Sequence, residues 1–246
     1  MNTLLTPLSF AGLTLRNRIV MPPMFSGFAT PRGEVTDRIV EYHRLRAAAG
    51  TALIIVEHTY VHPWGRLSDT QMGVHDDRLI PGLARLATAI KGEGAVACLQ
   101  LAHAGASATI AAIGRAPMGP TRMRHPFEKE VDAADAATVG EIALTIRAFG
   151  DGAVRAREAG FDAVEIHAAH GYLLSQFLSP LTNARGDEYG GDEQNRRRLH
   201  LGVLADLPVG RGAASAAGGA RSRSRPWSSP SGPSTPGTAN RQRPCP

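Results

Sequence analysis

Cysteine and aromatic residues are scarce in this 246-residue chain, and long apolar runs are missing. Two cysteines, Cys98 and Cys245, are too few for a disulfide framework, so we expect a reducing compartment such as the cytoplasm. No apolar run reaches the roughly 18 residues that a membrane span needs, and no basic segment precedes an apolar one at the N-terminus. We therefore expect neither a membrane helix nor a secretory signal. Cys98 stands in an apolar stretch and is predicted to be buried.

Positive charge is confined to the end of the chain. The net charge is +5, but six arginines and one aspartate follow residue 204, while residues 1–204 carry 21 basic and 21 acidic residues. A segment without net charge has no field to attract phosphates, so we expect no nucleic-acid partner for residues 1–204.

Residues 205–246 differ in composition from the rest. Pro, Gly and Ser supply 20 of the 40 residues from 207 to 246, and no acidic residue occurs there. Such a segment buries too little surface to offset its ordering entropy, so we predict a disordered tail after a folded part at 1–204. A natural linker and a reading-frame change in a GC-rich gene both give this composition. The helix expected from Asp192 is interrupted near Leu204, which favours the second.

Residues 1–204 repeat one pattern of apolar runs and helices. The runs at 18–21, 52–56, 95–101 and 162–166 are continuous rather than alternating, which is typical of parallel strands. Helical spacing appears at 37–49, at 79–91 and from 138 onward, where a capping box is expected. The first helix is predicted to bury Ile39, Tyr42 and Leu45. Two short apolar pieces around Gly12 predict a hairpin.

Glycine precedes three of these apolar runs, at Gly50, Gly94 and Gly160. Glycine accepts the left-handed conformation that ends a helix. A repeated order of helix, glycine and buried strand predicts an α/β fold with a parallel sheet of about four βα units.

The four strand ends carry the residues that suggest chemistry, because reactive groups of α/β barrels gather where strands finish. The first end is Met21-Pro22-Pro23-Met24-Phe25, where proline takes the chain out of the ladder, as a simple loop entry also would. At the second end, Glu57 precedes His58, and we expect Glu57 to form a salt bridge. At the third, Gln100 offers a donor and an acceptor, which suits a flavin pyrimidine edge or a backbone contact.

The fourth strand end is the most distinctive. His167, His170 and Tyr172 follow an apolar run within six residues. Two imidazoles can polarise one oxygen by hydrogen bonding, and a phenol can deliver a proton. A metal site and a pair of structural histidines are the alternatives, although no third carboxylate or cysteine ligand is evident nearby.

Four stretches together resemble the Old Yellow Enzyme family of flavin oxidoreductases over roughly residues 3–204. They read LRNRIVMPPM, LIIVEHTYVHPWGR, ACLQLAHAG and EIHAAHGYLLSQFLSPLTNARGDEYGGDEQNRRRL, and they occur in the order of the family. The last stretch is long and highly specific.

The resemblance implies a (β/α)8 TIM barrel that holds FMN at the carboxyl ends of its strands and takes electrons from NAD(P)H. It implies reduction of α,β-unsaturated carbonyl compounds, with His167 and His170 on the substrate oxygen and Tyr172 as the proton donor. It also implies contacts of the flavin with Pro22, Pro23, Met24, Phe25, His58 and Gln100.

The chain departs from the family pattern at two places. Phe25 stands where many relatives have Cys or Thr and cannot form a hydrogen bond there. The family's phosphate site lies after the seventh and eighth strands, which have no counterpart here, so we expect poor stability and weak or no FMN binding. Three further interpretations stay open: a non-catalytic half-barrel that pairs with itself or a partner fragment, a piece of a larger iron–sulfur flavoenzyme of the same family, and a metal-dependent hydrolase.

Overall fold

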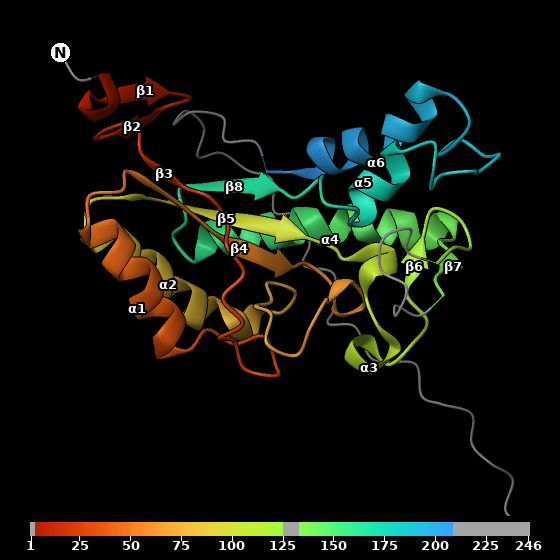
Figure 1. Cartoon of the computed structure of the whole chain (residues 1–246), viewed down its shortest axis with the longest axis horizontal. Helices are drawn as coiled ribbons and strands as arrows, with labels where there is room; N and C mark the ends of the chain where they lie inside the picture. The colour runs from red at the N-terminus through yellow and green to blue at the C-terminus, as the bar shows by residue number, and fades with distance from the viewer. Residues whose placement is uncertain (1–2, 125–132, 209–246) are drawn as a thin grey trace, which may run out of the picture. The chain divides into compact units, whose positions relative to one another are not determined.

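The computed structural model describes residues 3–124 and 133–208 (Figure 1). The predicted disordered tail lies outside these residues apart from its first four positions, and the division at residue 204 stays a prediction. The last described helix, α6 (Glu193–Asp206), begins after the cap Asp192, whose side chain accepts from the Asn195 backbone N–H. It continues through Leu204 rather than ending there.

A short hairpin precedes the main sheet. Strands β1 (Leu8–Phe10) and β2 (Leu13–Leu15) pair antiparallel, after the short helix η1 (Thr3–Leu5). The chain reverses at Ala11 and Gly12, which adopt φ of 46° and 81°. Positive φ is cheap for glycine, so Gly12 accounts for the position of the turn. The predicted hairpin is confirmed.

The main sheet has four parallel strands in chain order: β3 (Val20–Met21), β4 (Leu53–Tyr60), β5 (Val96–Ala102) and β8 (Ala163–Ile166). The helices α1 (Asp37–Ala48), α2 (Ile80–Gly92) and α4 (Val139–Glu158) connect them. Gly50, Gly94 and Gly160 have φ of 103°, 78° and 87°, and Thr138 and Glu141 form the expected capping box. The repeated βα pattern is therefore confirmed.

The connections contain smaller elements. The loop after β4 holds η2 (Pro63–Gly65) and η3 (Asp77–Leu79), and the segment after β5 holds η4 (Gly105–Ser107), α3 (Ile110–Ile113) and the pair β6 (Met118–Gly119) and β7 (Asp135–Ala136). Helix α5 (Leu173–Leu178) follows β8 and packs against α6.

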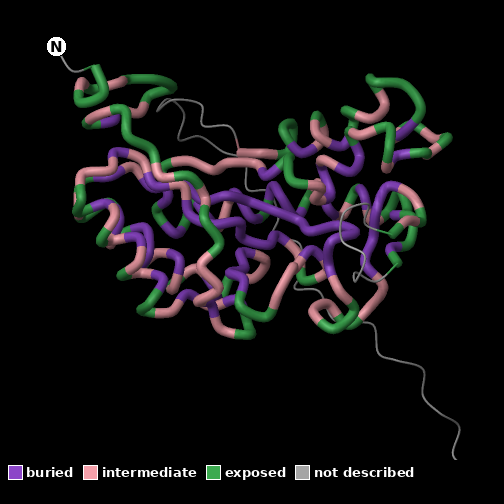
Figure 2. Tube along the Cα trace, viewed as in Figure 1, coloured by how far each residue is buried: buried purple, intermediate pink, exposed green. Residues whose placement is uncertain are grey.

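The two faces of the main sheet are packed differently. Alternate residues of β4 and β5 join the core beneath the helices and are fully buried: Ile54, Val56, Ala97, Leu99 and Leu101. The residues that alternate with these point to the opposite face, which we call the inner face. On it Val20 is exposed and Leu53, Ile55, Val96 and Ala163 are partly exposed, whereas Cys98 and Gln100 are buried. Figure 2 shows β8 partly exposed along its length. Among the described residues, no helix covers the inner face.

Helix α1 does not bury the stripe expected from its sequence. Ile39, His43 and Ala47 are fully buried, whereas Leu45 is 51% exposed. The expectation for Leu45 was wrong. The buried residues of α1 are spaced by four, and one of them is His43, which a pattern of apolar residues does not include. The burial of Cys98 at 5% exposure is confirmed.

His43 should make stability depend on pH. Burial lowers its pKa to about 4, so the unfolded chain, with a pKa near 6.5, binds more protons between these values. The stability that the fold gains from the neutral His43 ring is fully present above about pH 6.5. It is lost as the pH falls toward 4, by up to about 1.4 kcal/mol per pH unit. The unfolding free energy, measured with urea at several pH values across this range, should rise less steeply with pH in His43→Gln. The difference corresponds to about one proton, or about 1.4 kcal/mol per pH unit. Leu45→Gln, an exposed change on the same helix, should keep the original slope; equal slopes in all three proteins would contradict the assignment.

Candidate active site

Five side chains meet at the carboxyl edge of the main sheet: Phe25, His58, His167, His170 and Tyr172, which we call the imidazole cluster. Phe25 stacks on His58 with ring centroids 5.0 Å apart. The His58 ring centroid lies 6.3 Å from that of His167 and 5.8 Å from that of Tyr172. His167 lies 4.7 Å from Tyr172 and 5.1 Å from His170. Parallel strands finish at the same edge, so residues from three strand ends come together.

His58 is held in one orientation by a residue that the sequence did not indicate. The Gln71 side-chain amide donates to His58 Nδ1 at 2.5 Å and also to the His58 carbonyl at 3.1 Å. Burial lowers the His58 pKa to about 4, so the ring is neutral at pH 7. A neutral imidazole that accepts at Nδ1 carries its proton on Nε2. Gln71 lies in the loop after β4, and no strand-end pattern marks it.

The histidine pair forms a relay of hydrogen bonds with a fixed direction. The Ala169 backbone N–H donates to His167 Nδ1 at 3.3 Å, and His167 Nε2 lies 3.3 Å from His170 Nδ1. Burial lowers the His167 pKa to about 4, so its neutral ring carries the proton on Nε2 and donates to His170. A neutral His170 then carries its own proton on Nε2. His170 is exposed, and its φ of 56° is unusual outside glycine.

Gln100 lies on the inner face one strand away from Glu165. Its side-chain amide donates to Glu165 Oε1 at 2.5 Å, and the two residues are paired in the register of β5 and β8. In the part of the chain that the structure describes, no hydrogen bond reaches the Gln100 carbonyl oxygen. Gln100 therefore presents an acceptor at this edge, and its contact with a flavin stays a prediction.

Glu57 forms no salt bridge with any described residue. Its side chain is fully buried and accepts from the Ser26 backbone N–H at 2.7 Å. Burial raises the pKa of this carboxyl. The predicted ion pair was wrong because the chain after β3 folds back over β4 and supplies a backbone donor. Glu57 thus anchors the loop that carries Phe25.

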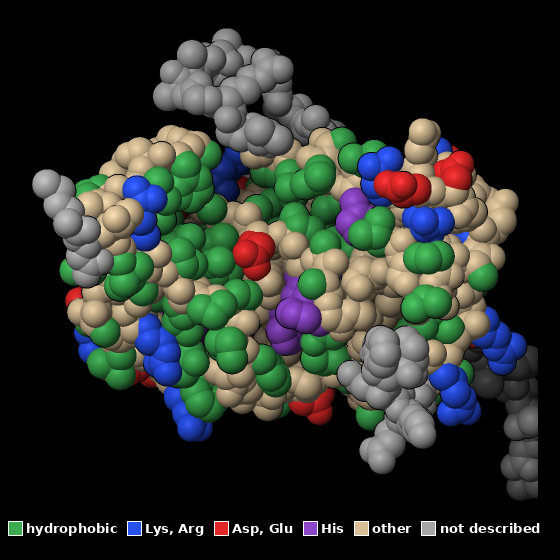
Figure 3. All heavy atoms as spheres, turned by 45° about the horizontal axis from the view of Figure 1, so that its top comes forward, with side chains coloured by type: hydrophobic (Ala, Val, Ile, Leu, Met, Phe, Trp, Pro, Cys, Tyr) green, Lys and Arg blue, Asp and Glu red, His purple; other side chains and the backbone are tan. Residues whose placement is uncertain are grey.

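Pro22, Pro23 and Met24 lie between β3 and Phe25. Met24 is 54% exposed and Phe25 is 44% exposed, so apolar surface stands open next to the cluster. In Figure 3, histidine side chains lie among hydrophobic ones on the visible face. The flavin contacts predicted for these three residues remain predictions.

The donor set suits the ring of a flavin. The cluster offers apolar and aromatic surface, imidazole N–H donors and the Gln100 amide, and the lowered pKa values keep His58 and His167 uncharged. No lysine or arginine within the described ranges forms a hydrogen bond with, or stacks on, Phe25, His58, His167 or His170. A flat, uncharged heteroaromatic ring therefore fits the residues present, whereas a phosphate finds no basic partner among them.

Gly105 should be intolerant of a side chain, and it packs against the helix that begins after Tyr172. Its φ is +62°, and an added Cβ would lie 2.5 Å from Gln176 Oε1 and 2.8 Å from Leu173 Cα. Strain and overlap together should cost Gly105→Ala about 2–4 kcal/mol. Gly114→Ala is the matched control, because its φ is +72° but nothing lies within 4 Å of its added Cβ. Urea unfolding that gave equal losses for both variants would contradict this packing.

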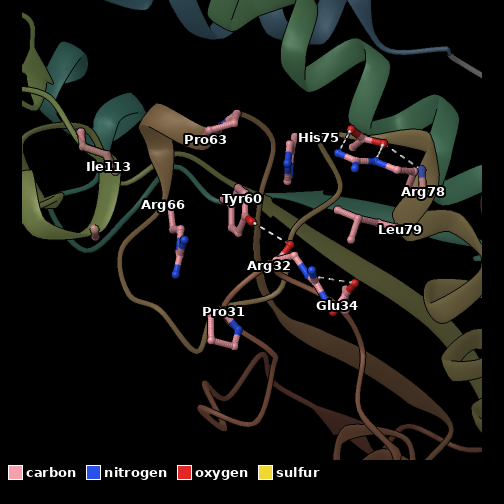
Figure 4. A pocket seen from close by; sticks show the side chains of 12 residues that line it. Pro31, Arg32, Glu34, Tyr60, Pro63, Arg66, His75, Arg78, Leu79 and Ile113 are labelled. Atoms are coloured by element: carbon pink, nitrogen blue, oxygen red, sulfur yellow. Dashed lines mark hydrogen bonds and ion pairs between the residues drawn. The ribbon is translucent and has the colours of Figure 1, made fainter.

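A hollow lies apart from the imidazole cluster. It has a volume of about 520 Å³ and is lined by the loops before α1 and α2 and by α3. Figure 4 shows Tyr60, Arg66 and His75 around it, with the Tyr60 hydroxyl directed at the Arg32 carbonyl. Its arginines are paired with acids, namely Arg32 with Glu34, Arg66 with Asp69 and Arg78 with Asp76. None of the residues that line it was predicted from the sequence to take part in catalysis or flavin binding.

Two absences among the described residues bear on the alternatives. No group of three His, Cys, Asp or Glu is arranged to hold a metal ion, which the metal-hydrolase interpretation would need. No helix within residues 3–124 and 133–208 has the length and apolarity of a membrane span.

Comparisons with known proteins agree with the geometry. Residues 3–211 match the model of the NADH:flavin oxidoreductase / NADH oxidase family. The chain is 45% identical over 202 residues to an NADPH dehydrogenase of Bacillus licheniformis, covering 82% of this chain and 58% of the relative. It is 46% identical over 209 residues to that of Geobacillus thermodenitrificans, covering 84% and 59%.

Solved structures show the same likeness. The Old Yellow Enzyme homologue from Zymomonas mobilis superposes with a TM-score of 0.77 at 32% identity, covering 83% of this chain and 59% of that one. Morphinone reductase gives 0.76 at 31%, covering 83% and 58%. The predicted α/β fold of the TIM-barrel type is confirmed, and the chain spans somewhat under 60% of the length of these relatives.

Proposed function

Because the chain belongs to the NADH:flavin oxidoreductase / NADH oxidase family, we propose that it is an FMN-dependent NAD(P)H oxidoreductase acting on activated C=C bonds of α,β-unsaturated carbonyl compounds. One observation carries this proposal. Two coupled imidazoles and a phenol stand together at the carboxyl edge of the sheet, with an amide acceptor and open apolar surface beside them.

FMN, when bound, supplies the hydride-transfer chemistry, and NAD(P)H is its reductant. Met24, Phe25 and His58 would border the ring, and Gln100 would meet its pyrimidine edge. Pro22 and Pro23 would shape the backbone that approaches it. These assignments rest on the placement of the residues at one edge and on the family.

The histidine pair would bind the substrate oxygen. His170 Nε2–H is not used in the relay and would donate to this oxygen, and His167 Nε2–H would donate to the same oxygen only in place of its bond to His170. Two N–H donors draw electron density from a carbonyl and stabilise the negative charge that develops on its oxygen. Because burial keeps the His167 ring neutral, this polarisation operates by hydrogen bonding without proton transfer.

Tyr172 would donate the proton. Its ring lies against both His167 and His58, which places Tyr172 beside the imidazoles that would bind the substrate oxygen. A phenol is a weak acid with a pKa near 10, which suits protonation of a carbon that has gained electron density. The names of the relatives, NADPH dehydrogenase and morphinone reductase, agree with a nicotinamide-dependent reduction.

The test is turnover of the 246-residue chain with saturating FMN. NADPH consumption under anaerobic conditions should depend on added 2-cyclohexenone and yield cyclohexanone, well above a control with FMN alone. Flavin fluorescence measured in parallel gives the FMN affinity, which we expect to be weak. Bound flavin with no enone-dependent turnover would overturn the proposal, as would failure to bind FMN at any concentration. A yellow protein purified with one FMN per chain would overturn the expectation of weak binding.

A further inference from the structure

Strand β4 is irregular where it reaches the imidazole cluster. Its pairing with β5 shifts register between Val56 and Thr59, so His58 stands outside the regular ladder. Such a bulge re-aims a side chain and is common beside functional sites. The loop after β4 then returns alongside the strand, where the Tyr60 backbone N–H donates to the Met72 carbonyl at 3.0 Å. Backbone pairing therefore holds this loop next to His58.

The side-chain amide of Gln71, in the same loop, has a fixed orientation. Its oxygen accepts from the Leu67 backbone N–H at 2.7 Å, and a backbone N–H can only donate. The amide nitrogen therefore faces His58, where it donates to Nδ1 at 2.5 Å and to the carbonyl at 3.1 Å. Gln71 is only 2% exposed, so little water competes for these bonds. The Leu67 N–H thus determines, through Gln71, that the proton of a neutral His58 lies on Nε2.

His58 Nε2 remains available to a ligand. The His58 ring is 7% exposed, yet Nε2 is not among the fully buried polar atoms, and no described residue forms a hydrogen bond with it. Phe25 stacks on the ring, and His167 and Tyr172 meet it edge-on. An N–H donor among aromatic rings is suited to an acceptor atom on the edge of a flat ligand.

The surroundings of His58 keep this donor uncharged. Burial lowers the His58 pKa to about 4, and the nearby imidazoles of His167 and His170 lower it further in the same direction. No carboxylate within the described ranges acts on the ring to oppose them. The ring therefore stays neutral above about pH 5, and it donates without adding a positive charge to the site.

We propose that Gln71 is a positioning residue that makes His58 an uncharged hydrogen-bond donor to the flavin ring. This inference rests on the proposed function, because FMN is the ligand that it names. His58 would contact the ring, whereas Gln71 would act only through His58. The direction of the amide is therefore the property that matters, and a substitution that reverses it should convert the His58 donor into an acceptor.

Gln71→Glu makes this reversal with almost no change in shape. Its carboxylate can accept from Leu67 and from His58 but cannot donate, so a neutral His58 should carry its proton on Nδ1. The added charge should raise the pKa of His58 by about one to three pH units. Nitrogen-15 NMR of the 246-residue chain without FMN, assigned with His58→Phe, measures both properties. A wild-type ring protonated on Nδ1, or the same tautomer in both proteins, would overturn the proposal.

The affinity for FMN, measured by flavin fluorescence, links the tautomer to the ligand. Above the His58 pKa of the variant, Gln71→Glu should bind FMN about 2–10-fold more weakly than the wild type. Below that pKa the imidazolium again donates from Nε2, so the ratio of the two Kd values should approach one. A role of Gln71 in the fold alone would give a ratio that does not change with pH.

Two further variants complete the experiment. His58→Phe should weaken FMN binding about 2–10-fold at every pH, and adding Gln71→Glu to it should change nothing more. Gln194→Glu is the matched control, because it adds the same charge at an exposed position near the start of α6 and should leave the His58 titration unchanged. Circular dichroism verifies the fold of each variant. If Gln71→Glu does not fold, Gln71→Met removes the donor without adding charge and should also weaken binding.

The outcomes separate this inference from the proposed function. Equal FMN affinity of the wild type and His58→Phe would overturn the role of His58 and leave the proposed oxidoreductase standing. An additional loss when Gln71→Glu is combined with His58→Phe would show that Gln71 does not act through His58, which also overturns the inference. No binding of FMN by any of the proteins would overturn both.

Discussion

Tyr172→Phe should slow the reduction of 2-cyclohexenone by a factor of about 10² to 10⁴ and leave the reduction of FMN by NADPH nearly unchanged. The substitution keeps the ring that packs against His167 and His58 and removes only the hydroxyl. Protonation of the substrate carbon belongs to the second half-reaction alone. Stopped-flow absorbance of the flavin, recorded separately with NADPH and with the enone, distinguishes the two steps.

Tyr189→Phe is the matched control for this experiment. Tyr189 packs partly buried against the core and lies outside the imidazole cluster, so loss of its hydroxyl should affect neither half-reaction. Equal losses in both half-reactions of Tyr172→Phe would indicate that Tyr172 only shapes the site. No loss in either would assign the proton to another donor.

Phe149→Ala should lower the free energy of unfolding by about 3–5 kcal/mol. Phe149 is fully buried on α4, in the core between the helices and the sheet. Removing the ring loses transfer free energy and leaves a cavity that rigid neighbours cannot fill. The total stability of a domain is only about 5–15 kcal/mol, so the variant should unfold at much lower urea concentration. Protein concentration must be held fixed if copies associate.

Val139→Ala provides the comparison on the same helix. Val139 begins α4 and is 48% exposed, so its truncation should change stability by no more than about 0.5 kcal/mol. A loss below about 1 kcal/mol for Phe149→Ala would contradict the packing of α4 described above. The denaturant dependence of the unfolding free energy should be the same in all three proteins.

The imidazole cluster could be predicted because its members follow strands that the sequence marks clearly. Continuous apolar runs located β4 and β8, and parallel strands finish at one edge, so His58 and His167 were expected at the same edge of the sheet, although β5 lies between their strands. Gln71 could not be found in this way. It lies in a loop 13 residues after His58, and its contact depends on how that loop folds back.

Two errors at the level of single side chains have related causes. Glu57 was expected to find a cation, but the chain after β3 supplies the Ser26 backbone N–H instead, and no sequence pattern encodes a backbone donor. Leu45 was expected inside and lies outside, because His43 occupies the buried position. In both cases tertiary packing overrode the preference of the side chain.

Under the proposed function, the direction of the relay would restrict which molecules bind at the site. The Ala169 amide sets the tautomer of His167, and His167 in turn sets that of His170, so the open end of the pair always offers hydrogen. Ketones, aldehydes and nitro compounds can meet it with a lone pair. Amines that are protonated at neutral pH would bring a second hydrogen to the same point and be rejected. In the proposed function, one main-chain N–H would thus influence the choice of a ligand that it does not contact.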